Sequence, residues 1–143
     1  MNKVLFSSQK EEWGTPQEFF DKLNNEFNFT VDVCALPYNA KCARYYTPET
    51  DGLAQNWDNE TVWCNPPYGR KIASWVEKAA HAKATVVMLV PARTDTKWFH
   101  DYVYKKAECR FVKGRLKFES ENMGGDPAPF PSMVVIFRNK EIV

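Results

Sequence analysis

ATVVMLVPAR, residues 84–93, contains the longest apolar run of the chain. An unbroken run from Thr85 to Val90 is typical of a strand that is buried on both faces, as in the middle of a parallel sheet. The run is far too short to cross a bilayer, because a membrane-spanning helix takes about 20 apolar residues. The stretch therefore predicts the central strand of an α/β domain, and we expect no membrane partner.

Helical patterns lie on both sides of this strand in the sequence. KIASWVEKAAHAK, residues 71–83, has four apolar residues at helical spacing on one face: Ile72, Trp75, Val76 and Ala79. TKWFHDYVYKKA, residues 96–107, predicts a second helix whose inward residues are Trp98, Phe99 and Tyr102. A strand between two helices is the repeating unit of α/β proteins.

An earlier helix is predicted over QEFFDKLNNEF, residues 17–27. Thr15 suits the N-cap of this helix, Pro16 suits its first turn, and Glu18 would complete a capping box. Four apolar residues of the segment share one face at helical spacing: Phe19, Phe20, Leu23 and Phe27. The chain therefore begins its α/β alternation with a helix.

Four further segments complete the predicted sheet and its connections. NFTVDVCA (28–35) and TVWCNPP (61–67) are short buried strands by their apolar and β-branched residues. The segment between them is rich in turn residues, and one helical turn is expected at 39–44. ECRFVKGRLKFE (108–119) and PSMVVIFRN (131–139) are two strands with no helix between them, so they should pair antiparallel as a hairpin.

The predicted fold is a compact Rossmann-like, doubly wound α/β sheet, mostly parallel, with a C-terminal antiparallel hairpin at its edge. Residues 1–143 are too few for two domains, so we expect a single domain. Residues 1–12 are expected to form a flexible N-terminal segment. The loop SENMGGDPAPF (120–130) would form the tip of the hairpin.

Composition places the chain among ordinary globular proteins, with 44% hydrophobic and 26% charged residues. The first residues lack the apolar core of a signal peptide, which favours a cytoplasmic location with reduced cysteines. The four cysteines show no C-x-x-C spacing and lie far from both histidines in the sequence, so no metal site is expected.

Charge is distributed unevenly along the chain. Residues 1–60 carry 5 basic and 10 acidic side chains, whereas residues 61–143 carry 14 basic and 8 acidic ones. KKAECRFVKGRLK, residues 105–117, has six basic residues against Glu108 alone. This stretch could meet the phosphates of a nucleic acid, or it could be a solvated face of the domain.

Three residues with functional potential fall at the expected carboxyl ends of strands: Asp32, Asn65 and Pro91. Ligands of open parallel sheets bind at this edge. A dinucleotide is disfavoured, because DVCALPYNA after the first strand contains no glycine and cannot form a G-x-G-x-x-G turn.

The motif at Asn65 to Gly69, N-P-P-Y-G, offers hydrogen-bond acceptors and an aromatic face. Two prolines remove two N–H donors and leave the Pro66 carbonyl beside the side-chain oxygen of Asn65. Two acceptors can hold one –NH2 group by both hydrogens, while Tyr68 stacks on a planar ring. The alternative is a stiff turn in which Asn65 caps the following helix.

An aromatic amine such as that of adenine fits these features. Its nitrogen is a poor nucleophile because the lone pair is delocalised into the ring. Acceptors for both N–H groups favour a pyramidal nitrogen and turn the lone pair toward an electrophile. Catalysis of this kind consists of positioning and electrostatics, and it needs no strong base.

Asn65-Pro66-Pro67-Tyr68 resembles the catalytic tetrapeptide, (D/N/S)-P-P-(Y/F/W), of S-adenosylmethionine-dependent amino methyltransferases. The wider pattern is similar to the phage-type, Dam-like DNA N-6-adenine methyltransferases over nearly the whole chain, from about Trp13 to Phe137. The motifs that carry this resemblance are W-G-T-P-Q-E-F-F, D-V-C-A, T-D-G-L-A-Q-N-W, V-W-C-N-P-P-Y-G, K-G-R-L-K-F and P-F-P-S-M-V-V-I-F, in the order of the family.

The resemblance implies methyl transfer from S-adenosyl-L-methionine to the exocyclic amino group of a flipped adenine in DNA. The implied catalytic residues are Asn65, Pro66, Pro67 and Tyr68. The implied cofactor-binding residues are Trp13, Thr15, Pro16, Asp32, Cys34, Asp51 and Asn65. Asp32 would face the ammonium of the cofactor and Asp51 its adenine. The DNA-binding candidates are Lys113, Arg115, Lys117 and Phe118, with Phe118 on the base and Arg115 on a phosphate.

The biological setting implied by the resemblance is a phage or prophage gene product in the bacterial cytoplasm. Its substrate would be double-stranded DNA, protected in this way from restriction. A single small domain has a small footprint on DNA, which favours a homodimer. Without a separate recognition domain, the target would be read by the 36–56 segment or the 120–130 loop.

The sequence departs from the family pattern at two points. The usual glycine-rich turn after the first strand is missing, and no obvious acid is present for the ribose hydroxyls beyond Asp32, Glu49 and Asp51. Two alternatives therefore remain open. One is a methyltransferase of another amine or amide, such as RNA adenine or protein glutamine, and the other is a degenerate module that binds DNA without turnover.

Overall fold

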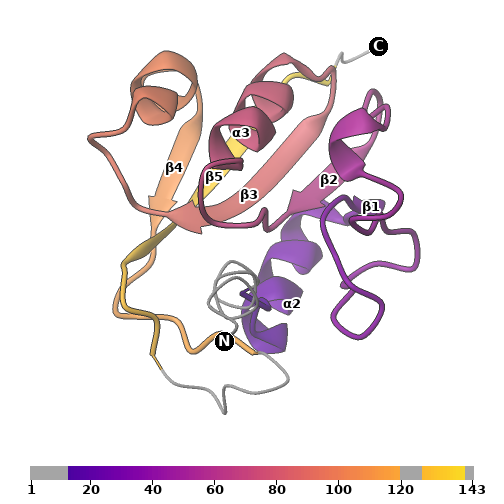
Figure 1. Ribbon diagram of the computed structural model, residues 1–143, viewed down its shortest axis with the longest axis horizontal. Helices are drawn as coiled ribbons and strands as arrows, with labels where there is room; N and C mark the ends of the chain where they lie inside the picture. The colour runs from indigo at the N-terminus through magenta and orange to yellow at the C-terminus, as the bar shows by residue number, and fades with distance from the viewer. Residues whose placement is uncertain (1–12, 120–126, 141–143) are drawn as a thin grey trace, which may run out of the picture.

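The computed structural model describes residues 13–119 and 127–140, which fold around a mixed sheet of five strands in the order β1-β2-β3-β5-β4. Figure 1 shows the sheet with its parallel strands pointing toward one edge. The strands are β1 (Val31–Asp32), β2 (Thr61–Cys64), β3 (Thr85–Pro91), β4 (Glu108–Phe111) and β5 (Ser132–Arg138). As predicted from its apolar run, β3 is central, and all but its first residue are buried.

The C-terminal strands form the expected antiparallel hairpin at one edge of the sheet. β4 and β5 pair antiparallel, which confirms the hairpin pairing. However, β5 also pairs antiparallel with β3, so it lies inside the sheet and β4 forms the edge. The predicted hairpin therefore does lie at one edge of the sheet, with β4 as its outer strand. Burial explains the order of the two strands: β5 buries every residue from Ser132 to Phe137, whereas the ends of β4 are exposed.

This insertion also changes the balance of strand pairings. β1 with β2 and β2 with β3 are parallel, while β5 makes antiparallel pairs with both of its neighbours. A sheet with two parallel and two antiparallel pairings is mixed, so the expected mostly parallel sheet is confirmed only for β1 to β3.

Helices cover both faces of the sheet. α3 (Ile72–His81) buries the four residues predicted from its periodicity, and it lies across the front of the sheet in Figure 1. α2 (Gln17–Phe27) packs Phe20 against Trp63 of β2, with ring centroids 5.3 Å apart. A 3-10 turn, η1 (Gly52–Ala54), lies against α3. The helix expected at 96–107 is instead a short π-helical turn, η2 (Phe99–Val103).

The start of α2 differs from the expected capping box. The helix begins at Gln17 after Pro16, and no side chain of its own N-terminus caps it. Instead, the carboxylate of Glu119 accepts a hydrogen bond from the Gln17 N–H at 3.3 Å. Thr15 is 2% exposed, and its hydroxyl is bonded elsewhere, as described below. A contact from a distant segment has therefore replaced the local cap.

Two loop segments are ordered by backbone pairing with the sheet region. Residues 44–46 run beside β1, where Tyr46 N–H donates to Asp32 O at 2.9 Å, and no helix forms at 39–44. Gly14 and Glu119 exchange two backbone hydrogen bonds of 2.9 and 2.8 Å. This pair ties the segment after β4 to the segment before α2.

Two of the predicted segments concern residues that the structure does not describe. The expected flexible segment 1–12 and most of the expected hairpin tip, at 120–126, lie outside the described residues. Within the described residues, no helix is long and apolar enough to cross a membrane.

Candidate active site

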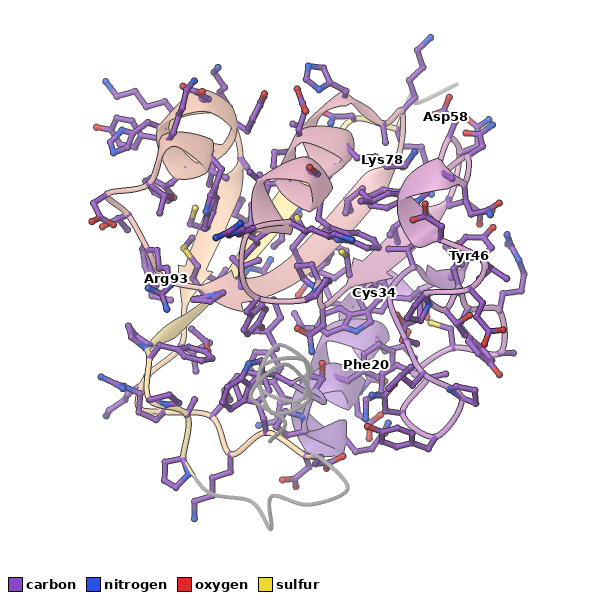
Figure 2. All side chains as sticks on the ribbon, viewed as in Figure 1. Phe20, Cys34, Tyr46, Asp58, Lys78 and Arg93 are labelled. Atoms are coloured by element: carbon purple, nitrogen blue, oxygen red, sulfur yellow. The ribbon has the colours of Figure 1, made fainter. Side chains whose placement is uncertain are left out.

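A cavity opens at the carboxyl ends of β1 and β2, the edge of the sheet that the sequence predicts for a ligand. It holds about 570 Å³ of empty space, part of it open to solvent. Figure 2 shows Cys34, one of its lining residues, at this edge of the sheet near α2. Its lining includes Trp13, Gly14, Thr15, Asp32, Cys34, Lys41, Asn65, Pro66 and Pro67.

The side chain of Asn65 is held in one orientation by the segment before α2. Its Nδ2 donates to the carbonyl of Trp13 and, at 3.0 Å, to Oγ1 of Thr15. Its Oδ1 is buried and has no hydrogen-bond partner among the described residues. A buried acceptor left unpaired costs about 1–3 kcal/mol. The arrangement therefore presents an acceptor that a ligand donor would satisfy.

Pro66 and Pro67 line the cavity beside Asn65, whereas Tyr68 lies behind them. The Tyr68 hydroxyl donates to the Leu89 carbonyl at 2.9 Å, which joins the motif to β3. Burial raises the pKa of the Tyr68 phenol well above its usual value. The phenol therefore stays neutral, and it cannot act as a base at physiological pH.

Four aromatic rings form a cluster beside the cavity: Trp13, Tyr68, Phe118 and Phe130. Phe130 and Phe118 meet the Tyr68 ring edge to face, with centroids 5.5 and 6.2 Å apart. Trp13 packs on both phenylalanines in the same way. Phe118 is only 3% exposed. The structure thus brings Phe118 to Tyr68 of the N-P-P-Y tetrapeptide, but as part of a packed cluster.

Asp32 is the buried acid of the cavity, with 2% of its surface exposed. Its carboxylate accepts hydrogen bonds from the N–H groups of Cys34 at 3.2 Å and Lys41 at 3.0 Å. Loss of hydration nevertheless dominates and raises the pKa of Asp32 to about 6. These two backbone donors fix the position of the carboxylate, which keeps further lone pairs for a cation.

Lys41 is a residue of the cavity that the sequence reading missed. Its side chain is 7% exposed, its Nζ donates to Gln17 Oε1 at 2.9 Å, and Glu119 Oε1 lies 3.8 Å away. The segment around it shows no periodicity that would predict burial. The one available signal was that no other lysine occurs between Lys22 and Lys71.

The remaining candidates for the cofactor lie outside the cavity wall. Pro16 is the residue before α2 and does not line the cavity. Asp51 is exposed, has a left-handed φ of 54°, and accepts a hydrogen bond from Leu53 N–H at the start of η1. Glu49 is also exposed. The structure therefore does not bring these three side chains together with Asp32.

The basic candidates for DNA contact lie on one exposed segment. Lys113, Arg115 and Lys117 are all exposed and follow the end of β4. Phe111 pairs with Met133, which pairs with Val90 of β3, so this end of β4 lies at the same edge of the sheet as the cavity. Through Glu119, the segment then reaches Gly14 in the cavity lining.

The histidines, cysteines and acids show no metal-binding arrangement within residues 13–119 and 127–140, where no three of them group together. Cys64 is buried, as expected for a small apolar residue, whereas Cys34, Cys42 and Cys109 are half-buried.

Comparison with known proteins agrees with the family resemblance that the sequence motifs show. The profile of the family described as DNA N-6-adenine-methyltransferase (Dam) matches residues 3–142. A DNA N-6-adenine-methyltransferase of Haemophilus phage HP1 is 31% identical over 141 residues, which cover 93% of this chain and 82% of the phage protein. A protein of the same name from Escherichia phage T1 is 31% identical over 109 residues, covering 73% of this chain and 45% of that one.

Proposed function

Since this chain belongs to the DNA N-6-adenine-methyltransferase (Dam) family, we propose that its cavity binds S-adenosylmethionine and the amino group of a DNA adenine. The enzyme is a DNA adenine methyltransferase. The proposed donor supplies an activated methyl group on a sulfonium centre. Asn65, Pro66 and Pro67 supply the surface on which the adenine amino group is held, and Tyr68 supports them from behind.

The cavity has features that fit this cofactor. It lies at the carboxyl ends of β1 and β2, the edge where open α/β sheets bind their ligands. Asp32 offers a buried carboxylate for an ammonium group, and Trp13, Thr15 and Cys34 line the same space. Pro16 and Asp51 lie outside the lining, so in this proposal they act by fixing the flanking segments.

The observation that carries the proposal is the unpaired Oδ1 of Asn65. The hydrogen bonds of Nδ2 to Trp13 and Thr15 fix which end of the amide faces the ligand. Pro66 adds a backbone carbonyl next to it, because neither proline can donate. Two acceptors side by side hold both hydrogens of an amino group, which turns the nitrogen lone pair away from the ring and toward the donor.

No side chain of the cavity needs to remove a proton before transfer. Tyr68 is neutral and bonded to Leu89 O, and Asp32 is engaged by two backbone donors. The chain therefore contributes orientation and preorganised acceptors, which are effective in a site that excludes water. Asn65 and Pro66 hold the amino hydrogens until one is released to solvent.

The same proposal extends to the fold and the setting. Residues 1–143 form one Rossmann-like methyltransferase domain in which β5 is the inserted antiparallel strand. The substrate is double-stranded DNA, from which the adenine is flipped into the cavity. A homodimer would enlarge the contact of Lys113, Arg115 and Lys117 with DNA, whereas Phe118 supports the segment from the packed cluster. The gene belongs to a phage or prophage, and its product acts in the bacterial cytoplasm to protect DNA from restriction.

Transfer of labelled methyl from S-adenosylmethionine to unmethylated double-stranded DNA tests the proposal. N6-methyladenine should carry the label with the natural protein, and Asn65→Ala should give none while keeping its cooperative unfolding. If only RNA or only protein becomes labelled, that molecule, rather than DNA, is the substrate. Binding of DNA without cofactor binding or turnover would indicate a degenerate module.

A further inference from the structure

Asp32 and Lys41 form a pair of buried, opposite charges on the wall of the cavity. Building on the function proposed above, we propose that Lys41 binds the carboxylate of the amino-acid part of the cofactor, while Asp32 binds its ammonium. The site would then recognise the α-amino acid as a zwitterion, with one protein charge for each of its two charges. Lys41 is a cofactor-binding residue in this account.

The two side chains are adjacent without neutralising each other. The backbone N–H of Lys41 donates to Asp32 Oδ2 at 3.0 Å, so the lysine backbone is held directly beside the acid. The ion pairs of the described residues include none between Asp32 and the Lys41 ammonium. Both residues line the same cavity. An α-amino acid carries its ammonium and its carboxylate on one carbon atom. Such a group is complementary to the separate charges of Asp32 and Lys41.

Among the residues that the structure describes, the partners of the Lys41 ammonium are weak for a charge in this position. One is the neutral Gln17 Oε1 at 2.9 Å, and the other is Glu119 Oε1 at 3.8 Å. Glu119 has a side chain that is 58% exposed, so its attraction is screened by water. A charge that is 7% exposed is stable only when it is well paired. A ligand carboxylate in the cavity would supply the better partner.

A purely structural role for Lys41 is the competing explanation. In that case, the side chain only links the start of α2 to Glu119 through Gln17. Loss of the lysine would then lower the stability of the protein, but it would not change how the protein distinguishes ligands with and without a carboxylate. Ligand preference, rather than affinity alone, separates the two roles.

The test compares S-adenosylmethionine with its decarboxylated analogue, which keeps the ammonium and lacks only the carboxylate. Calorimetric titration of the natural protein should show affinity for the analogue weaker by about 10- to 100-fold, the range for a charged hydrogen bond. In Lys41→Met both ligands should bind equally, at about the weaker of the two affinities. Lys22→Met, which removes an exposed lysine of α2, should keep the preference of the natural protein.

Several results would overturn the inference. If the natural protein binds both ligands equally, no group reads the carboxylate, and this holds whether or not Lys41→Met folds. If folded Lys41→Met keeps the preference, another group reads it. If the natural protein binds neither ligand, the proposed cofactor itself is wrong, which distinguishes that failure from a failure of Lys41. Lys41→Arg should retain part of the preference, since it keeps the charge.

Discussion

Nδ2 of Asn65 donates a hydrogen bond to Oγ1 of Thr15 at 3.0 Å, across 50 positions of sequence. This bond decides which end of the Asn65 amide faces the cavity, because the nitrogen is turned to Thr15 and to the Trp13 carbonyl. Thr15 acts on the reaction through Asn65, so we regard it as a positioning residue in addition to any contact with the cofactor.

Thr15→Val removes this acceptor while preserving the shape of the side chain. We expect kcat to fall by about tenfold, the size of one lost hydrogen bond of about 1.4 kcal/mol, with a smaller change in the KM for S-adenosylmethionine. Thr15→Ser keeps the hydroxyl and should retain most of the activity. Full activity in Thr15→Val with a loss in Thr15→Ser would show that the methyl group of Thr15, rather than its hydroxyl, matters.

Asn65→Asp should be strongly impaired here, although the family tetrapeptide includes aspartate. A carboxylate at this position would place an oxygen against the Trp13 carbonyl, where the Nδ2 donor now lies. We expect weaker cofactor binding and kcat reduced by at least tenfold, as measured by methyl transfer at saturating cofactor. Asn25→Ala, on the exposed face of α2, is the matched control and should leave both unchanged. Full activity of Asn65→Asp would contradict the assigned orientation of the amide.

Cofactor affinity should depend on pH through Asp32. Burial raises the pKa of this carboxylate to about 6, and only its ionised form attracts an ammonium. The apparent Kd should be constant above about pH 7 and rise by about tenfold per unit below pH 6. Asp32→Asn should bind weakly at every pH. An unchanged pH profile in that variant would assign the titration to another group.

The same shift has the opposite effect on the stability of the ligand-free protein. A pKa raised from 3.8 to about 6 means that the folded state gains stability as the pH falls through 6 toward 3.8. Other acids titrate as well: burial acts to raise the pKa of Glu60, but hydrogen bonds from Thr30 and Arg44 together with nearby positive charges outweigh it and lower that pKa. The difference in Tm between the natural protein and Asp32→Asn isolates Asp32, and it should shift in favour of the natural protein as the pH falls.

Gly14→Ala should open the pairing between the segments before α2 and after β4. A Cβ at Gly14 would lie 2.2 Å from the Glu119 carbonyl oxygen, so the two backbones must separate. We expect a loss of about 1–3 kcal/mol in the free energy of unfolding and weaker cofactor binding. Gly114→Ala has open space but a φ of +77°, so it should cost about 1 kcal/mol without affecting cofactor affinity.

Replacing Lys113, Arg115 and Lys117 together by Met should weaken binding to DNA of any sequence. Each phosphate contact that is lost reduces the magnitude of the slope of log K against log salt by about 0.9. In the triple variant this magnitude should therefore fall by up to about 3. Lys83→Met, before the start of β3 and therefore at the opposite end of the strand, is the control. An unchanged slope in the triple variant would remove this segment from the DNA interface.

Local patterns in the sequence predicted the elements that are set by local physics. The periodicity of α3 identified its four buried residues, and the apolar run of β3 identified the central strand. The position of Asn65 at the carboxyl end of β2 followed from the order of strands and helices. These features depend on neighbours within a few residues, which a single sequence shows directly.

The features that the sequence did not predict depend on contacts between distant segments. Glu119 caps α2 across 102 positions, which released Thr15 from the expected capping role. Lys41 is buried because its backbone bonds to Asp32 and its ammonium to Gln17. The internal place of β5 depends on competition between two strands for the edge of β3. No spacing within the sequence encodes these choices.

The internal position of β5 has a consequence for how the protein is made. β5 is the last of the described strands to leave the ribosome, yet β3 and β4 both pair with it. Until it arrives, the seven residues of β3 present an open, apolar edge to the cell. A chain that is terminated before Ser132 would therefore aggregate rather than work at a reduced rate. Refolding of the whole chain should be slow, because the paired residues of β3 and β5 are about fifty positions apart in the sequence.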